Sequence, residues 1–203
     1  MGHPCKSMSR QTQVTITVVA TALVAVLSAC TARQPMVIEE LDEGTAASVT
    51  YSQTSIALSP DKIFVRANER PYLNLGAIRV NRNRNRQYFI WLGIWDTNYA
   101  INAERQPKEF ESIVLVIDGE ELPLHILTWN HEVIGTSKPV YKKIFDEALD
   151  AYYQLTLEQM LLLVGAEVIK VRTAGATPRE FVPWYREENA RSDLAEFLRR
   201  ISE

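Results

Sequence analysis

The segment at residues 88–96 constrains the fold of this chain more than any other. It reads Tyr-Phe-Ile-Trp-Leu-Gly-Ile-Trp-Asp, and successive side chains of an extended strand point to opposite faces. Phe89 and Trp91 then share one face, and Ile90 and Leu92 share the other. Because both faces are apolar, the strand must be covered on both sides. The pattern therefore predicts a central strand between two layers.

Other segments are typical of strands and tight turns. Residues 112–117 and 122–129 are β-rich and flank Asp118-Gly119, a strong short-range hairpin signal. Residues 140–145 are a further candidate strand, at an edge, since lysines there discourage pairing with other chains. Within the central strand, Gly93 indicates a close backbone approach or a bulge.

Two helices are predicted near the end of the chain. Thr156 and Gln159 have the spacing of a capping box, which predicts a short helix over residues 157–164. A C-terminal amphipathic helix follows from apolar residues at helical spacing, with Asp193 on another part of the wheel; the apolar positions are Leu194, Phe197, Leu198 and Ile201. With about eight strand candidates joined by short turns, we expect a mainly β or α+β fold, an antiparallel β-sandwich-like domain.

The N-terminal residues have the layout of an export signal. Lys6 and Arg10 are the only charges before an apolar core of about 14 residues, which is too short to cross a bilayer as a helix. We expect residues 1–29 to be a signal peptide and residues 30–48 a flexible acidic tether of about 20–25 Å. Residues 49–203 are then a single β-rich globular domain.

The signal ends in Leu27-Ser28-Ala29-Cys30, which resembles the lipobox of bacterial lipoproteins. The resemblance implies a lipid-modified Cys30 that anchors the exported protein to a membrane. The alternative is an ordinary signal peptide cleaved after Ala29, followed by a chance cysteine. Since the other cysteine, Cys5, precedes the cleavage site, no internal disulfide is expected. Thr31, rather than Asp, after Cys30 implies the outer membrane of a two-membrane bacterium, facing the periplasm.

The charge balance argues against one class of partner. Removal of residues 1–29 leaves 20 basic and 25 acidic residues, a net charge of −5. A mildly acidic protein has no general attraction for a polyanion. We therefore expect no nucleic-acid partner, and instead the membrane, through Cys30, and an envelope protein.

An arginine-rich segment is the candidate binding site. Residues 79–87 read Arg-Val-Asn-Arg-Asn-Arg-Asn-Arg-Gln. If the segment is extended, Arg82, Arg84 and Arg86 share a face and form a guanidinium row for phosphates or carboxylates. If it is a turn between two strands, as its asparagines favour, the arginines belong to a solvated loop.

No motif of catalysis or metal binding is found. His131-Glu132 begins like the helical zinc-protease motif, but that motif needs a second histidine at the position of Gly135. His125 is interpreted as a packed or surface residue. No serine has the neighbours of a nucleophile elbow. We therefore predict no catalytic residue, no metal and no cofactor.

These observations predict a membrane-tethered binding or accessory component of a cell-envelope assembly. The alternative is a binder of a small ligand or an envelope polymer, such as lipopolysaccharide or peptidoglycan, through Arg82, Arg84 and Arg86. A hydrolase is a third hypothesis and requires a histidine within about 3 Å of a carboxylate. A partner-binding protein requires an exposed apolar patch or a usable strand edge. Trp129, Trp184 and Tyr185 lie near predicted element ends, where ligand or partner sites often occur. We expect them instead to be structural, with the Trp184 ring buried where it seats the terminal helix.

Overall fold

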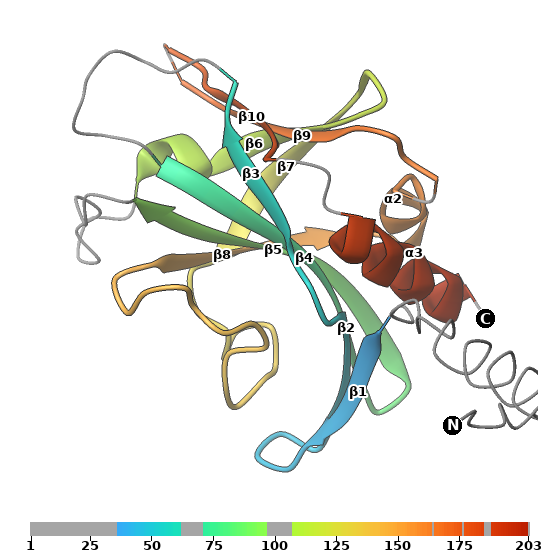
Figure 1. Ribbon diagram of the computed structural model, residues 1–203. Helices are drawn as coiled ribbons and strands as arrows, with labels where there is room; N and C mark the ends of the chain where they lie inside the picture. Colours follow the sequence, from blue (N-terminus) through green and yellow to red (C-terminus); the bar gives the residue numbers. More distant parts are fainter. Residues whose placement is uncertain are drawn as a thin grey trace, which may run out of the picture. The chain divides into compact units, whose positions relative to one another are not determined.

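Antiparallel strands dominate the computed structural model (Figure 1). It describes residues 36–61, 71–96, 107–163, 165–175, 177–184 and 188–202. The strands are β1 (Val37–Asp42), β2 (Ala47–Ser52), β3 (Ile56–Pro60), β4 (Pro71–Arg82), β5 (Asn85–Asp96), β6 (Ser112–Ile117), β7 (Glu120–Thr128), β8 (Leu149–Leu155), β9 (Ile169–Thr173) and β10 (Glu180–Pro183). Three short or terminal helices accompany them: η1 (Lys108–Phe110), α2 (Leu157–Leu161) and α3 (Glu188–Ser202).

Eight of these strands close into a barrel. The order around it is β4-β3-β10-β9-β6-β7-β8-β5, and β5 pairs back with β4. The mainly β prediction is confirmed, but the β-sandwich is wrong. Apolar alternation shows which side of a strand is buried, whereas closure depends on which strands pair, such as β5 with the distant β8. Pairing all round removes the free edges that two separate sheets would leave.

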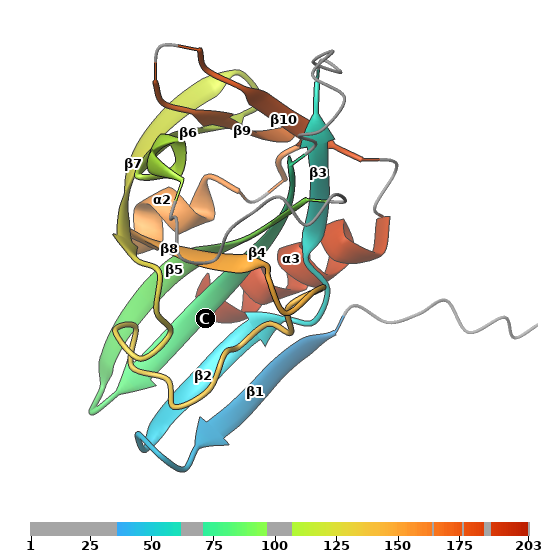
Figure 2. The ribbon, with the colours of Figure 1, turned by 90° about the vertical axis from the view of Figure 1, so that its left-hand side faces the viewer.

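The β1–β2 hairpin extends the sheet beyond the barrel (Figure 2). β4 changes partner along its length: residues 73–75 pair with β3, and residues 78–81 pair with β2. The predicted tether is therefore wrong over residues 37–48, which form β1 and the start of β2. β1 was not predicted because it contains acidic residues such as Glu39 and Glu40, and acidic residues are uncommon in strands.

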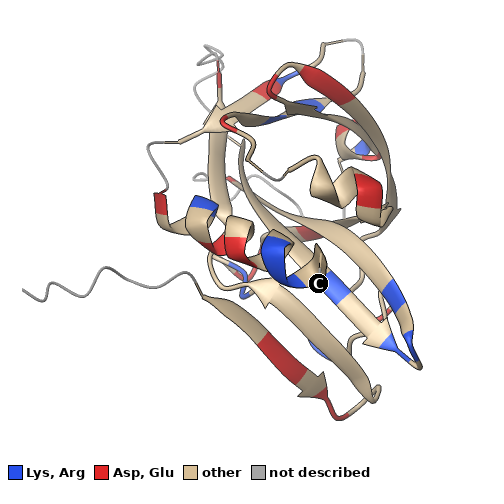
Figure 3. Cartoon of the chain, turned by 90° about the vertical axis from the view of Figure 1, so that its right-hand side faces the viewer, with Lys and Arg blue, Asp and Glu red and all other residues tan. Residues whose placement is uncertain are grey.

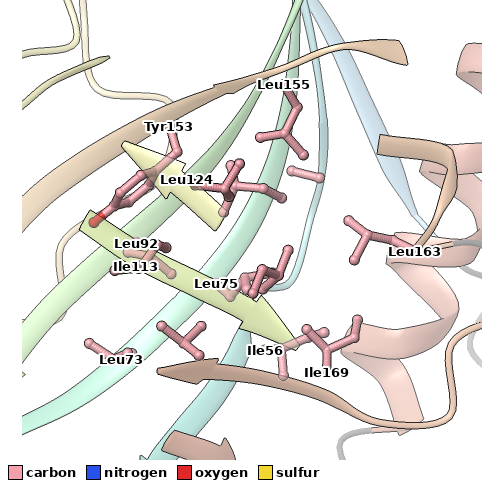
Figure 4. Packing of buried hydrophobic residues seen from close by; sticks show 14 of the residues in the cluster. Ile56, Leu73, Leu75, Leu92, Ile113, Leu124, Tyr153, Leu155, Leu163 and Ile169 are labelled. Atoms are coloured by element: carbon pink, nitrogen blue, oxygen red, sulfur yellow. The ribbon is translucent and has the colours of Figure 1, made fainter. Parts of the chain in front are cut away.

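The barrel interior is filled with mostly aliphatic side chains from the strands (Figure 4). The apolar side of α3 belongs to the same cluster through Leu194, Phe197, Leu198 and Ile201. The predicted C-terminal amphipathic helix is thus confirmed. The short helix α2 is confirmed with its capping box, in which Gln159 N donates to Thr156 Oγ1 and Thr156 N donates to Gln159 Oε1. It ends at Leu161, however, and not at residue 164 as predicted. No helix in the described ranges is long and apolar enough to span a bilayer.

A second buried cluster lies on the outer face of β4 and β5, as the two-sided pattern of residues 88–96 predicts. We call it the outer cluster: Ala47, Val49, Ile78, Val80, Phe89, Trp91, Ile134, Tyr141 and Tyr152. Its cover comes from the irregular segment 129–148 that joins β7 to β8. The strand predicted over residues 140–145 is wrong, because this segment has no regular structure there.

Two glycines make room for aromatic rings in the outer cluster. A Cβ on Gly76 would lie 2.4 Å from the ring of Tyr141, and one on Gly93 would lie 2.6 Å from the ring of Trp91. The two rings stack with centroids 4.6 Å apart. Gly93 is therefore a site of close approach, as predicted, although by a side chain and not by a backbone. The Tyr141 ring fits into the space above Gly76 and stacks on Trp91, and this close packing fixes the position of segment 129–148.

The β6–β7 hairpin forms as predicted from its Asp-Gly turn. Asp118 and Gly119 both have positive φ, 49° and 93°, and the strands on either side pair from Ile117 with Glu120 onwards. These are the dihedrals of a type I′ turn, whose twist matches that of the paired strands. Local turn chemistry was sufficient to determine this element.

Candidate functional site

The candidate arginines lie at the tip of the β4–β5 hairpin. Asn83 and Arg84 form a two-residue turn with φ of 52° and 65°. Arg82 pairs with Asn85 and Arg86 pairs with Asn81, so the side chains of Arg82 and Arg86 point to opposite faces of the hairpin. The segment is therefore the predicted turn, and the three guanidinium groups form an exposed tip instead of a row on one face.

A fourth arginine of the same segment has a structural position. The Arg79 side chain is only 11% exposed. Its Nη2 donates to Thr50 Oγ1 at 2.8 Å and lies 3.5 Å from Glu39 Oε1. Arg79 therefore joins β4 to β2 and β1 and is not part of the exposed tip.

The two histidines of the domain do not meet a carboxylate in the described residues. His125 Nδ1 lies 2.8 Å from Ser112 Oγ, its cross-strand neighbour, and the pair is exposed. His131 offers its backbone oxygen to Thr136. Among the residues that the structure describes, no third group of a nucleophilic triad lies beside either ring. In the described ranges, no cluster of three metal-ligating side chains is formed either.

An open pocket of about 380 Å³ lies beside the Ser112–His125 pair, where η1 meets the ends of β6 and β9. Its lining combines charged and hydroxyl side chains, namely Lys108, Glu109, Glu111, Ser112 and Thr177, with Ala174 and Gly175. Glu109 forms an ion pair with Arg179. No local pattern predicts this pocket, because its residues come from segments more than 60 positions apart.

A buried carboxylate lies under the irregular segment. Asp150 Oδ1 accepts from Trp91 Nε1 at 2.9 Å, and Asp150 Oδ2 lies 3.7 Å from Lys143 Nζ. Burial raises the pKa of Asp150, while the Trp91 hydrogen bond and Lys143 act in the opposite direction. Near it, the buried Tyr152 hydroxyl has no hydrogen-bond partner in the described part of the chain, and burial raises the pKa of Tyr152.

An aromatic row lies on the outside of β4 and β5. Trp184 stacks on Tyr72 at 4.9 Å, Tyr72 stacks on Trp95 at 4.7 Å, and Trp95 meets Phe145 at 5.7 Å. The predicted burial of the Trp184 ring is wrong, since Trp184 is 38% exposed. The chain leaves β10 along β3, where Trp184 N donates to Ala57 O at 2.9 Å, and the ring reaches Tyr72 on the neighbouring strand β4. Trp129 is partly buried against the interior cluster, and Tyr185 lies outside the described residues.

The most distinctive surface is the free edge of β1. Among the described strands, β1 pairs with β2 alone. Gln53 N donates to Met36 O at 3.0 Å, and bonded pairs alternate along an antiparallel ladder. The backbone groups of Val37, Glu39 and Leu41 therefore point away from β2. Leu41 is also 67% exposed, so this edge offers both unpaired backbone groups and an apolar side chain.

Asp42 is the last residue of β1 and holds the C-terminal end of this edge in place. Its carboxylate accepts from Ser137 N and Ser137 Oγ, each at 2.6 Å, and from Gly44 N and Thr45 N. The Ser137 hydroxyl is the main reason why the pKa of Asp42 is lowered, and burial opposes the shift. These bonds hold the β1–β2 turn against the irregular segment. The sequence placed Asp42 in a flexible tether and so missed it.

Asp193 fixes the other end. It is fully buried, contrary to the prediction that it lies away from the apolar side of α3. Its Oδ1 accepts from Met36 N at 2.8 Å, and its Oδ2 accepts from Thr54 N at 3.1 Å. The carboxylate thus joins α3 to the start of β1 and to the turn after β2. A helical wheel shows this position as polar, but not that it faces backbone donors.

Cys30 and the rest of the predicted signal peptide lie outside the described residues, so lipidation stays a prediction. Comparisons of the chain with protein-family models, with curated proteins and with solved structures found no match.

Proposed function

We propose that this protein is a lipid-anchored component of the bacterial envelope that binds an extended segment of another envelope protein along the free edge of β1. The anchor is Cys30, and the membrane is the outer membrane on its periplasmic side. The domain acts by binding and not by catalysis. The observation that carries the proposal is the edge at Val37, Glu39 and Leu41, with which no other described strand pairs, since an exposed edge accepts an added strand.

The charges on β1 favour a different chain as the added strand over a second copy. Glu39 and Glu40 are consecutive in the middle of β1, so their side chains point to opposite faces, and Glu39 is the one whose backbone groups point to the free edge. Two copies of β1 paired in antiparallel fashion about Glu39 would place the two Glu39 carboxylates opposite each other, which is unfavourable. A partner strand with lysine or arginine at the matching positions would gain from the same charges.

Strand addition can be tested by removing one outward-pointing N–H group. In cells, a photo-cross-linking amino acid at the exposed Glu43 position reports a partner on β1. We expect Leu41→Pro to abolish the cross-linked product, because proline has no N–H to donate. The matched control, Leu41→Ala, removes the side chain but keeps the N–H, and should retain most of the product. Equal cross-linking in both variants would exclude strand addition.

The anchor needs a separate test. Cells that grow with a radiolabelled fatty acid should label the protein and leave the Cys30→Ser variant unlabelled. The native protein should remain on membranes in high salt, because several acyl chains give a stable anchor. An unlabelled native protein that washes off in salt would contradict the proposed anchoring.

A second candidate function is binding of an anionic envelope polymer at the hairpin tip. The observation that favours it is the exposure of Arg82, Arg84 and Arg86 around one turn. Guanidinium groups form bidentate hydrogen bonds with phosphate and carboxylate oxygens. If this function holds, changing all three arginines to glutamine should abolish sedimentation with peptidoglycan or lipopolysaccharide and leave the β1 cross-link unchanged.

A further inference from the structure

The start of β1 is held rigidly against α3. Met36 N donates to the buried carboxylate of Asp193, and Met36 O accepts from Gln53 N. Both backbone groups of Met36 are therefore used within the domain. The chain that precedes Met36 has to leave the domain from this one place, beside α3.

Few residues separate this place from the proposed anchor. Cys30 lies six positions before Met36, so even a fully extended chain spans only about 20 Å between them. A compact unit of the size of Pro35–Glu203 is about 40 Å across. A lipid on Cys30 therefore keeps the Met36 side of the domain at the membrane and prevents the opposite side from reaching it.

The Met36 side carries a helix with an exposed surface suited to lipid headgroups. Figure 3 shows α3 lying across this face, next to β1. The outward side of α3 has three arginines and two glutamates, Arg191, Arg199, Arg200, Glu188 and Glu196, so it is locally basic although the domain is acidic overall.

Small side chains and the position of the cations favour close contact with a headgroup layer. Ala195 is exposed in the middle of the outward side of α3. Arg199 and Arg200 occupy the last turn and share Glu196 as an ion-pair partner, which leaves one net positive charge there. Cations at the end of a surface helix are attracted to anionic phospholipids.

We infer that the outward side of α3, together with Met36, rests on the phospholipid headgroups of the membrane that holds Cys30. This inference depends on the proposed lipidation. Segment 129–148 packs on the outer face of β4 and β5, opposite the face that α3 covers, and therefore points away from the bilayer. The β1 edge is then presented beside the membrane, where a membrane-bound partner can reach it.

The full lipidated chain in vesicles of phosphatidylethanolamine and phosphatidylglycerol tests the orientation. Cys5 and Cys30 are the only cysteines, one removed with the signal peptide and the other acylated, so an introduced cysteine is the single free thiol. A fluorophore is attached in Ala195→Cys on α3 or in Asp146→Cys on segment 129–148, and a spin-labelled headgroup lipid is the quencher. We expect quenching at least threefold stronger at position 195. Equal quenching, or stronger quenching at position 146, would overturn the inference.

Two further measurements separate the possible failures. Fatty-acid labelling of the same preparations shows whether the anchor exists: without label the proposed function fails, whereas labelled protein with equal quenching refutes only the orientation. Insertion of 20 Gly/Ser residues between Gln34 and Pro35 roughly doubles the average end-to-end distance of the connection. It should at least halve the quenching at position 195, and unchanged quenching would refute the argument from chain length.

Discussion

The β4–β5 and β6–β7 hairpins have similar turns but are buried in different ways. Both close with two residues of positive φ, Asn83-Arg84 and Asp118-Gly119. Along β6, buried and partly buried residues alternate, so only one face is covered. Along β5, residues 88–94 are all buried, since one face lies in the barrel and the other lies under segment 129–148.

This difference shows how an irregular segment can replace a second sheet. The outer cluster is rich in aromatic rings, Phe89, Trp91, Tyr141 and Tyr152, and its Trp91 donates to the buried carboxylate of Asp150. The interior cluster is mostly aliphatic and comes from regular elements. A segment without ladder hydrogen bonds is held in one conformation by specific contacts of this kind, so the outer cluster should be sensitive to shape and charge.

The largest expected effect tests whether burial is two-sided in one hairpin and one-sided in the other. Phe89→Ala removes a buried ring from the outer face of β5 and should lower the free energy of unfolding by about 3–5 kcal/mol. The matched change Val114→Ala, on the half-exposed face of β6, should cost less than about 1 kcal/mol. Urea unfolding followed by circular dichroism measures both. Similar losses would show that the hairpins do not differ.

A smaller effect is expected where the irregular segment meets β4. Gly76→Ala places a Cβ against the Tyr141 ring and should destabilise the fold by about 1–3 kcal/mol through overpacking. In a Tyr141→Ala background the same change should cost less than about 0.5 kcal/mol, because the clash is gone. A double-mutant cycle in urea gives the coupling, and additive losses would mean that the ring is not what requires a glycine.

The two turns should respond in opposite directions to exchange of their second residue. Arg84→Gly relieves a side chain at φ 65° and should stabilise the fold by about 0.5–1 kcal/mol. Gly119→Ala places a Cβ at φ 93° and should cost about 1–2 kcal/mol. Thermal unfolding compares the two variants with the native chain. A loss of stability in Arg84→Gly would show that the guanidinium group contributes more than its backbone conformation costs.

The smallest effect concerns the pH dependence of the outer cluster. Burial raises the pKa of Asp150 above its ordinary 3.8, so in the window just above pH 3.8 the folded chain binds more protons than the unfolded chain. The contribution of Asp150 to stability therefore falls as pH rises through that window. Asp150→Asn should remove this pH-dependent contribution. The stability of the variant, relative to that of the native chain, should therefore increase with pH. Unfolding in urea across pH 3–8 measures the difference.

Asp42 is the internal control, because its pKa is shifted in the direction opposite to that of Asp150. Its pKa is lowered by Ser137, so its contribution is present above the ordinary value and is lost as pH falls through the folded-state pKa. Asp42→Asn should therefore reduce stability most at neutral pH and least in acid. The same direction of change in both variants would contradict the assignment of these two carboxylates.

Much of the fold followed from local pattern. The central strand, the Asp118-Gly119 hairpin, the capping box of Thr156 and the apolar side of α3 were all predicted from residue periodicity and turn chemistry, because neighbours along the chain produce these features. β1 was missed, since its acidic residues have no strand signal until Arg79 is placed beside them.

The candidate sites depended on distant contacts. Periodicity showed that the second face of β5 needs a cover, but not that residues 129–148 supply it. The arginine tip was predicted as one of two alternatives. The free β1 edge, and the hydrogen bonds that Asp42 and Asp193 accept at its two ends, were not predicted. Asp42 is bound by Ser137, 95 positions away, and Asp193 by Met36, 157 positions away. Sequence alone determined which residues are apolar, turn-forming or helical, and tertiary structure decided which polar groups meet, because hydrogen bonds between distant residues exist only once the chain has closed around its core.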